Sequence, residues 1–125
     1  MGTSKYWDSS AVVVLWDDWG GWYDDVPPPQ LDFEGLGIRV PCIIISPYAK
    51  AGTVSHTQYE SGSTLRFIED VFNAPSLHHT DSRANSLADS FDFNQKPIKF
   101  KTIPAKYPTS YFLHKQPSFV PPDNE

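Results

Sequence analysis

Two short runs of apolar residues in the first half of the chain predict buried β-strands. Residues 11–16 (Ala-Val-Val-Val-Leu-Trp) and residues 40–45 (Val-Pro-Cys-Ile-Ile-Ile) are rich in β-branched side chains and lack the polar alternation of a half-solvated strand. We expect the two strands to share one sheet. They lie more than twenty residues apart, which is too far for a tight hairpin and permits a parallel arrangement.

The spacing of the apolar residues changes after residue 60. Between residues 63 and 72 they recur with helical period, and the charged side chains fall elsewhere, which predicts an amphipathic helix. The apolar stripe consists of Leu65, Ile68, Val71 and Phe72. Asn73 and Pro75 then close the helix. Buried strands joined to such a helix indicate a layered α/β fold.

The last quarter of the chain has a different composition. Six of the twelve prolines follow Lys96 and alternate with aromatic residues, so a regular element is not expected there. We therefore divide the chain into a folded part, residues 1–95, and an extended Pro-rich and aromatic-rich C-terminal tail, residues 96–125, laid over a surface. A length of 125 residues leaves room for one core at most.

Charge and hydropathy exclude some classes of function. Fifteen acidic against ten basic residues give a net charge of -5, which is the wrong sign for tracking a nucleic acid backbone. No apolar run reaches the roughly 18 residues of a transmembrane segment. The single cysteine, Cys42, cannot form an internal disulfide, and its apolar neighbours indicate a small core residue rather than a nucleophile.

An acidic pair follows the first predicted strand. Asp17 and Asp18 come directly after the apolar run, and in open α/β sheets ligands bind at the carboxyl ends of strands. Two carboxylates turned toward one point repel each other, and a divalent cation with a preference for oxygen ligands relieves that repulsion best. The alternative is that one aspartate closes an Asx turn while the other is solvated. Position alone leaves both interpretations open.

A histidine is the second candidate. His56 lies in a polar loop between the second strand and the helix, where a neutral imidazole could bind a metal ion or contact a phosphoryl oxygen, or could simply be solvated. The adjacent His78 and His79, and His114 in the tail, do not form such a pattern. The aromatic residues Trp19, Trp22 and Tyr23 could line a pocket or form a small apolar cluster.

Several motifs in a fixed order carry a family resemblance. Residues 14–24 read Val-Leu-Trp-Asp-Asp-Trp-Gly-Gly-Trp-Tyr-Asp. The motifs that follow are Val26-Pro27-Pro28-Pro29, Gly37-Ile38-Arg39-Val40-Pro41, Ile45-Ser46-Pro47-Tyr48-Ala49, Val54-Ser55-His56-Thr57-Gln58-Tyr59, Leu65-Arg66-Phe67-Ile68-Glu69-Asp70, Asp81-Ser82-Arg83-Ala84-Asn85 and Phe91-Asp92-Phe93. Over most of residues 6–95 the chain resembles the bacterial phosphoesterase family, which includes phosphatidylcholine-type phospholipases C and an acid phosphatase within the alkaline-phosphatase-like superfamily.

The resemblance implies a fold, a site and a reaction. It implies part of a three-layer alkaline-phosphatase-like sandwich, a divalent metal cation held by Asp17 and Asp18, and a catalytic role for His56. The implied reaction is metal-dependent hydrolysis of a phosphate ester, of which phospholipid is one candidate, by a Ser or Thr alkoxide that attacks phosphorus. The family is usually exported, which implies a periplasmic or secreted location.

Two departures from the family pattern bear on activity. Asp25 stands where many members carry a histidine. Family chains are several times longer, and their nucleophile lies in an N-terminal part that this chain does not contain. We therefore interpret residues 1–95 as the C-terminal part of a phosphoesterase catalytic domain that needs the missing N-terminal part. We expect little turnover from the 125-residue chain alone.

Two other classes of function remain open. The chain could be an inactive remnant that acts as a binding or interaction module, in which case the aromatic loop and the tail would matter more than the carboxylates. It could also be a subdomain without a separate function, whose exposed sheet edge pairs with another part of a larger fold.

Overall fold

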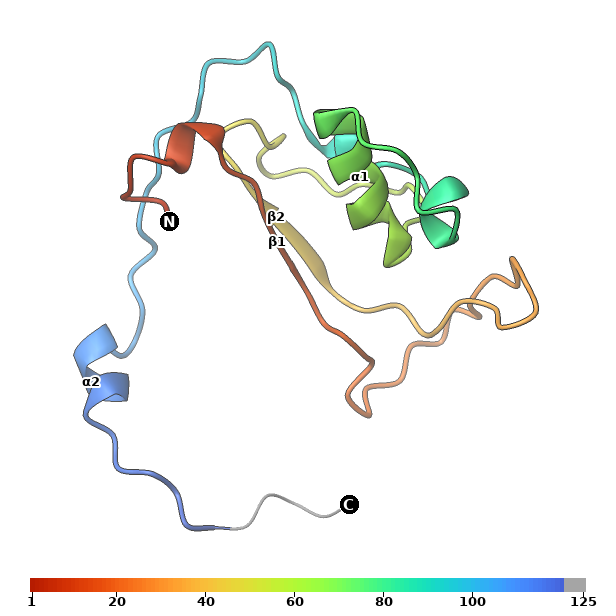
Figure 1. Ribbon diagram of the computed structural model, residues 1–125. Coiled ribbons are helices and arrows are strands. Elements are labelled where there is room, and N and C mark those ends of the chain that lie inside the picture. The colour runs from red at the N-terminus through yellow and green to blue at the C-terminus, as the bar shows by residue number, and fades with distance from the viewer. Residues whose placement is uncertain (121–125) are drawn as a thin grey trace.

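The computed structural model describes residues 1–120 and contains one small sheet. Strands β1 (Val12–Leu15) and β2 (Cys42–Ile45) pair side by side, as predicted, with Val12 opposite Ile45 and Leu15 opposite Cys42 (Figure 1). The pairing is antiparallel, so the parallel arrangement that the spacing permitted is not the one adopted. The connection, residues 16–41, contains no helix to carry a crossover and turns back as a wide hairpin instead.

The strands are less buried than their composition predicts. Val14 and Leu15 of β1 are 47% and 40% exposed, and Ile43 of β2 is 57% exposed. The prediction of strands buried on both faces is therefore wrong for this structure, because two strands and one helix cannot cover both faces of a sheet. Cys42 is exposed as well, so its assignment to a core is also wrong.

Helix α1 (Gly62–Phe72) forms where the apolar period predicts it. Asn73 ends it in the left-handed conformation, with φ of 49°. The helix lies on one side of the two strands and packs against two 3-10 turns, η2 (Thr80–Ser82) and η3 (Leu87–Ser90) (Figure 1). Gly62 permits the close approach to η2, since a Cβ atom there would lie 2.8 Å from the carbonyl carbon of Thr80.

The core is small and lies between α1 and the segment that follows η3. Leu87 and Phe91 are buried, at 2% and 5% exposure. The Phe91 ring stacks on Phe67 of α1 and on Phe93, with ring centroids 4.8 Å and 5.4 Å apart. These contacts join the helix to the end of the folded part and make the described residues a small α/β unit.

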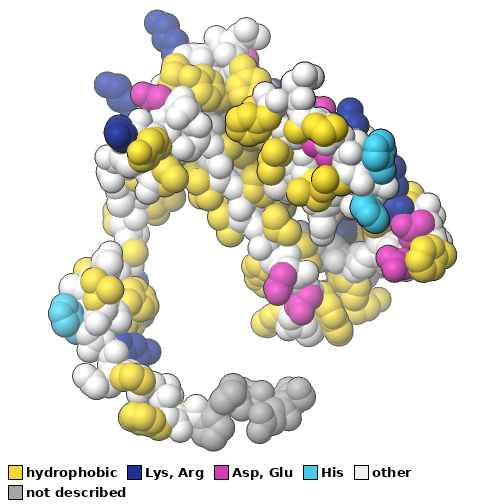
Figure 2. Space-filling view, viewed as in Figure 1, with side chains coloured by type: hydrophobic (Ala, Val, Ile, Leu, Met, Phe, Trp, Pro, Cys, Tyr) yellow, Lys and Arg dark blue, Asp and Glu magenta, His cyan; other side chains and the backbone are white. Residues whose placement is uncertain are grey.

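An apolar groove of about 600 Å³ separates α1 from β1. Val13 of β1 and Phe67, Val71 and Phe72 of α1 are among its lining residues. Phe72 is 74% exposed, so the apolar stripe of the helix is only partly covered. Figure 2 shows hydrophobic side chains distributed widely over the visible face of the body and along the tail.

The beginning of the tail packs, and the remainder does not. Trp7 belongs to the 3-10 turn η1 (Trp7–Ser9). Its indole Nε1 donates to the carbonyl of Ile98 at 2.9 Å, and its ring packs edge-to-face with Phe100, with ring centroids 5.2 Å apart. Beyond Phe100 the chain runs away from the sheet (Figure 1), and residues 101–120 are exposed. The expected tail over a surface is thus limited to its first residues. Residues 121–125 lie outside the described part.

The tail also contains one short helix, α2 (Thr109–Leu113), where no regular element was expected. Pro108 precedes the helix at its N-cap, a position that needs no N–H, and the next proline comes only at Pro117. The proline density of the whole tail concealed this proline-free interval. Among residues 1–120, no helix is long and apolar enough to cross a membrane.

Candidate functional site

The acidic pair lies in a tight turn directly after β1. The Trp16 amide donates to the carbonyl of Pro41 at 3.4 Å and so extends the ladder by one bond. Oδ1 of Asp18 then accepts the amide of Gly20 at 2.6 Å, and Oδ1 of Asp17 accepts the amide of Asp18 at 3.1 Å. Gly20 has φ of 58°, which glycine adopts without strain. The Asx turn that the sequence offered as an alternative is therefore present at Asp18.

The turn leaves part of each carboxylate free. Within residues 1–120, Oδ2 of Asp17 and Oδ2 of Asp18 accept no hydrogen bond. A cation such as Mg²⁺ or Ca²⁺ takes at least six oxygen ligands, and the same described residues contain no group of three or more His, Cys, Asp or Glu side chains that could hold an ion. The pair thus fits part of the ligand set of a hard cation, and an Asx turn does not preclude that role.

His56 lines a pocket of about 750 Å³ beside β2. The pocket lies between β2, the loop that follows it and η3, and its polar lining includes Lys50, Ser55, His56, Thr57, Tyr59 and Asp89. Asp17 and Asp18 are not among the lining residues, so the structure does not bring them into one cavity with His56. The pocket nevertheless reaches the end of the ladder from which the acidic turn leaves, because Cys42 lines the pocket and pairs with Leu15, two residues before Asp17.

Cys42 also lines this pocket. Partial burial raises the pKa of this thiol, so it stays protonated near neutral pH. Its expected lack of nucleophilic character is thus consistent with its surroundings, although it is not a core residue.

The Asp89 carboxylate accepts hydrogen bonds from three hydroxyl groups of the loop that carries His56. Its Oδ2 accepts hydrogen bonds from Ser55 Oγ at 3.2 Å and Thr57 Oγ1 at 2.8 Å, and its Oδ1 accepts one from the Tyr59 hydroxyl. The bond from Tyr59 is the largest cause that lowers the pKa of Asp89. Sequence reasoning missed this residue. The available signal was the alternation of hydroxyl side chains at 55, 57 and 59, which places them on one side of an extended segment.

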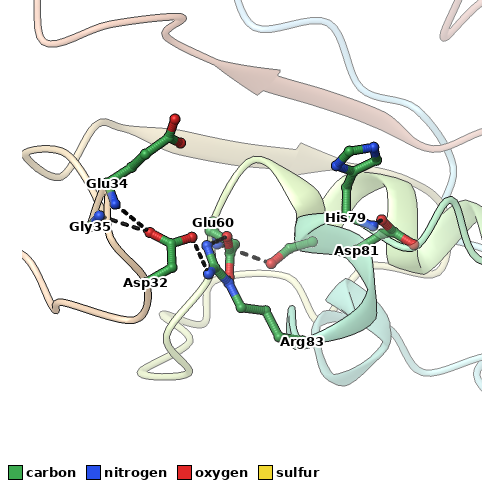
Figure 3. Close-up of polar contacts among 8 residues, drawn as sticks. Asp32, Glu34, Gly35, Glu60, His79, Asp81 and Arg83 are labelled. Carbon is green, nitrogen blue, oxygen red and sulfur yellow. Dashed lines mark hydrogen bonds and ion pairs between the residues drawn. The ribbon is translucent and has the colours of Figure 1, made fainter.

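Arg83 joins the β1–β2 connection to the start of α1. Its Nε and Nη2 donate to the two carboxylate oxygens of Glu60 at 3.0 Å and 2.9 Å, and its Nη1 pairs with Asp32 (Figure 3). Oδ1 of Asp32 also accepts the amides of Glu34 and Gly35. The hydrogen bond from Arg83 is the main cause that lowers the pKa of Asp32. This network was not predicted, because its members are far apart in the sequence.

Asp81 organises the loop that contains the paired histidines. It is fully buried and accepts hydrogen bonds from the Ser76 hydroxyl and from the amides of Leu77 and His79, the latter two at 2.9 Å. The bond from Ser76 is the largest cause that lowers the pKa of Asp81. His79 enters the arrangement through its backbone, which agrees with leaving it out of the candidate site.

Comparison with known proteins identifies the family to which this chain belongs. The sequence profile of the Phosphoesterase family matches residues 1–75, a range that includes Asp17, Asp18 and His56. The match covers more than half of the chain, and the chain therefore belongs to the phosphoesterase family. This confirms the resemblance that the ordered motifs indicated.

Curated relatives are phospholipases C from a bacterium and a plant. The chain is 30% identical to "Phospholipase C B" of Mycobacterium tuberculosis over 148 aligned residues, covering 97% of this chain and 28% of the relative. It is 32% identical to "Non-specific phospholipase C3" of Arabidopsis thaliana over 112 residues, covering 70% of this chain and 21% of the relative. The chain thus spans less than a third of the length of either protein.

Proposed function

We propose that this chain takes part in metal-dependent hydrolysis of phosphate esters, of the phospholipase C or phosphatase type, together with the remainder of a phosphoesterase catalytic domain. The observation that carries the proposal is the family match over residues 1–75, which spans both candidate groups. The names of the relatives favour a phospholipid substrate. The fold supports the proposal, since a two-stranded sheet with exposed faces fits one portion of a three-layer sandwich.

Each candidate residue has a distinct role in this proposal. The free Oδ2 atoms of Asp17 and Asp18 would hold the divalent cation. When bound, such a cation neutralises charge on phosphoryl oxygens and lowers the pKa of a coordinated hydroxyl group. His56 would donate a hydrogen bond or a proton to a phosphoryl or leaving oxygen from the wall of its pocket. Lys50 lines the same pocket and would attract the anionic ester.

Binding of Mn²⁺ tests the role of the acidic pair in the 125-residue chain itself. Bound Mn²⁺ enhances water proton relaxation, and we expect an enhancement that falls in both Asp17→Asn and Asp18→Asn. Asp25→Asn is the matched control, because it makes the same change of charge in the same connection. Equal Mn²⁺ binding by the wild type, Asp17→Asn and Asp18→Asn would overturn the metal site.

A second candidate function is a binding module without catalysis. It is favoured by the aromatic side chains of the β1–β2 connection, since Trp22 and Tyr23 are 73% and 79% exposed. In that case a soluble short-chain phosphocholine lipid would bind equally well to wild type and Asp17→Asn, whereas Trp22→Ala would weaken its binding. Loss of lipid binding in Asp17→Asn with retention in Trp22→Ala would favour the hydrolase instead.

A further inference from the structure

We propose that Asp89 is a positioning residue that holds His56 in place by fixing both of its neighbours. The inference rests on the proposed function, in which His56 contacts the phosphoryl group. Ser55 and Thr57, the residues on either side of His56, donate to the same carboxylate oxygen of Asp89 at 3.2 Å and 2.8 Å. Because both flanking side chains donate to one atom, the backbone is held on each side of His56.

The loop has few other restraints. Within the described part of the chain, residues 54–59 make no hydrogen bond between their backbone and other backbone groups. Inside the loop, the Thr57 amide donates to Ser55 Oγ at 3.2 Å, and the hydroxyl groups of Ser55 and Tyr59 lie 3.1 Å apart. The side-chain Nδ2 of Asn85 donates to the carbonyl of Gln58 at 2.9 Å, and Tyr59 adds a third hydroxyl bond to the Asp89 carboxylate. The conformation of the segment therefore depends on side-chain contacts, of which those to Asp89 form the largest group.

Asp89 itself is held in place by the turn to which it belongs and by Lys50. It belongs to η3, whose Leu87 is buried and whose N-cap, Ser86, accepts the amide of Ala88. Lys50 ties this turn to the end of the β2 segment, since its amide donates to the carbonyl of Ser90 at 3.0 Å and its Nζ to the carbonyl of Asp89 at 2.7 Å. The turn η3 thus holds the Asp89 carboxylate in place beside the loop of residues 54–59, which has no backbone-to-backbone hydrogen bonds within the described part of the chain.

The contacts also distinguish positioning from a direct role. Three hydroxyl groups of the loop, and that of Ser90 at 3.5 Å, occupy the two oxygens of the Asp89 carboxylate. The lowered pKa keeps the carboxylate ionised as their common acceptor. A carboxylate committed in this way acts on the reaction through His56 and not by touching the ester.

Backbone NMR of the 125-residue chain tests the inference. We expect Asp89→Ala to lower the order parameters of Ser55, His56 and Thr57 from about 0.85 to below about 0.6, while those of α1 stay unchanged. The double variant Thr57→Val/Tyr59→Phe keeps the carboxylate, removes two donors and should lower the same values. Asp92→Asn is the control, since within residues 1–120 the Asp92 carboxylate accepts one hydrogen bond, from the amide of Asn94.

Inorganic phosphate separates this inference from the proposed function. In the wild type, phosphate should shift the imidazole Cε1 proton of His56 in a saturable way, and Asp89→Ala should weaken that response. If phosphate does not shift the Cε1 proton of His56 in the wild type, the proposed contact between His56 and a phosphoryl group is overturned. The order parameters still report whether Asp89 holds the loop. Unchanged order in both Asp89→Ala and the double variant overturns the Asp89 inference, whatever phosphate does.

Discussion

The two candidate groups of this protein are held in contrasting ways. Asp17 and Asp18 are positioned by bonds to residues one or two places along the chain, within the turn they form. The loop that carries His56 is positioned by bonds to Asp89, more than thirty residues away. The acidic turn is thus a local structure, whereas the histidine loop depends on the packing of η3 against the rest of the molecule.

The two groups therefore depend on different parts of the molecule for their geometry. A local Asx turn persists whenever its few residues can adopt their dihedral angles, so the acidic pair tolerates changes elsewhere. The histidine loop loses its geometry when its distant support moves. Substitutions in the core, in the contacts of Arg83, or in an ion pair on the surface should therefore lower the stability of the protein to different extents.

Truncation of the core beneath the histidine loop should have the largest effect. Leu87 is only 2% exposed, and Leu87→Ala should lower the free energy of unfolding by about 2–5 kcal/mol because it leaves a cavity under η3. Urea denaturation measures the change. Leu113→Ala in α2, where the side chain is 76% exposed, should stay within about 0.5 kcal/mol. Similar losses in the two variants would contradict the assigned core.

Removal of the Arg83 bridge, which joins Asp32 of the β1–β2 connection to Glu60 before α1, should have an intermediate effect. Arg83→Lys keeps the charge but loses the fork that contacts Glu60 and Asp32 together, so the urea midpoint should fall by less than in Leu87→Ala. The control is Arg66→Lys, because Arg66 contacts Asp70 through a single nitrogen that an ammonium group can replace. A larger loss in Arg66→Lys than in Arg83→Lys would refute the bridge.

The surface pair within the β1–β2 connection should have the smallest effect on stability. Hydrogen bonds from Arg39 lower the pKa of Asp24 from 3.8 to about 2. A depressed pKa stabilises the fold above pH 3.8, and this contribution is lost as the pH falls toward about 2. Arg39→Gln should therefore lower stability at pH 7, have a smaller effect as the pH falls, and flatten the pH dependence of stability between pH 3.8 and about 2. The loss at pH 7 should be small, since the Arg39 side chain is 65% exposed and solvent screens the pair.

An NMR titration of the Asp24 carboxyl carbon checks this last expectation directly. The pKa should move from about 2 toward 3.8 in Arg39→Gln and should stay low in Arg66→Gln, which removes a cation from a different surface. A pKa of Asp24 that ignores Arg39 would show that the pair does not persist in solution.

The same contrast explains which features the sequence could predict. The strands, the helix and its end at Asn73 follow from short patterns of apolar residues and from one residue suited to a left-handed backbone. His56 was found as a loop histidine, and its pocket is now evident. Its placement there relies on Asp89, which no local pattern connects to it.

Two other features depended on context that short patterns do not contain. Burial of the strands was overestimated because an apolar run indicates what a strand would bury, not which neighbours are present to cover it. Helix α2 was missed because the proline content of the tail was averaged over residues among which Thr109–Leu113 has none. The metal ligation by Asp17 and Asp18 stays a prediction.

The wide β1–β2 hairpin has a consequence for how this protein can vary. The ladder closes over the long connection of residues 16–41, and the entropy of closing a flexible loop grows only with the logarithm of its length, by about 0.6 kcal/mol for each doubling. Insertions or deletions in the connection are therefore thermodynamically inexpensive, provided that they keep the acidic turn at its start and the contact of Asp32 with Arg83. The connection can thus change length and side chains during evolution while the strand pairing that supports it stays the same.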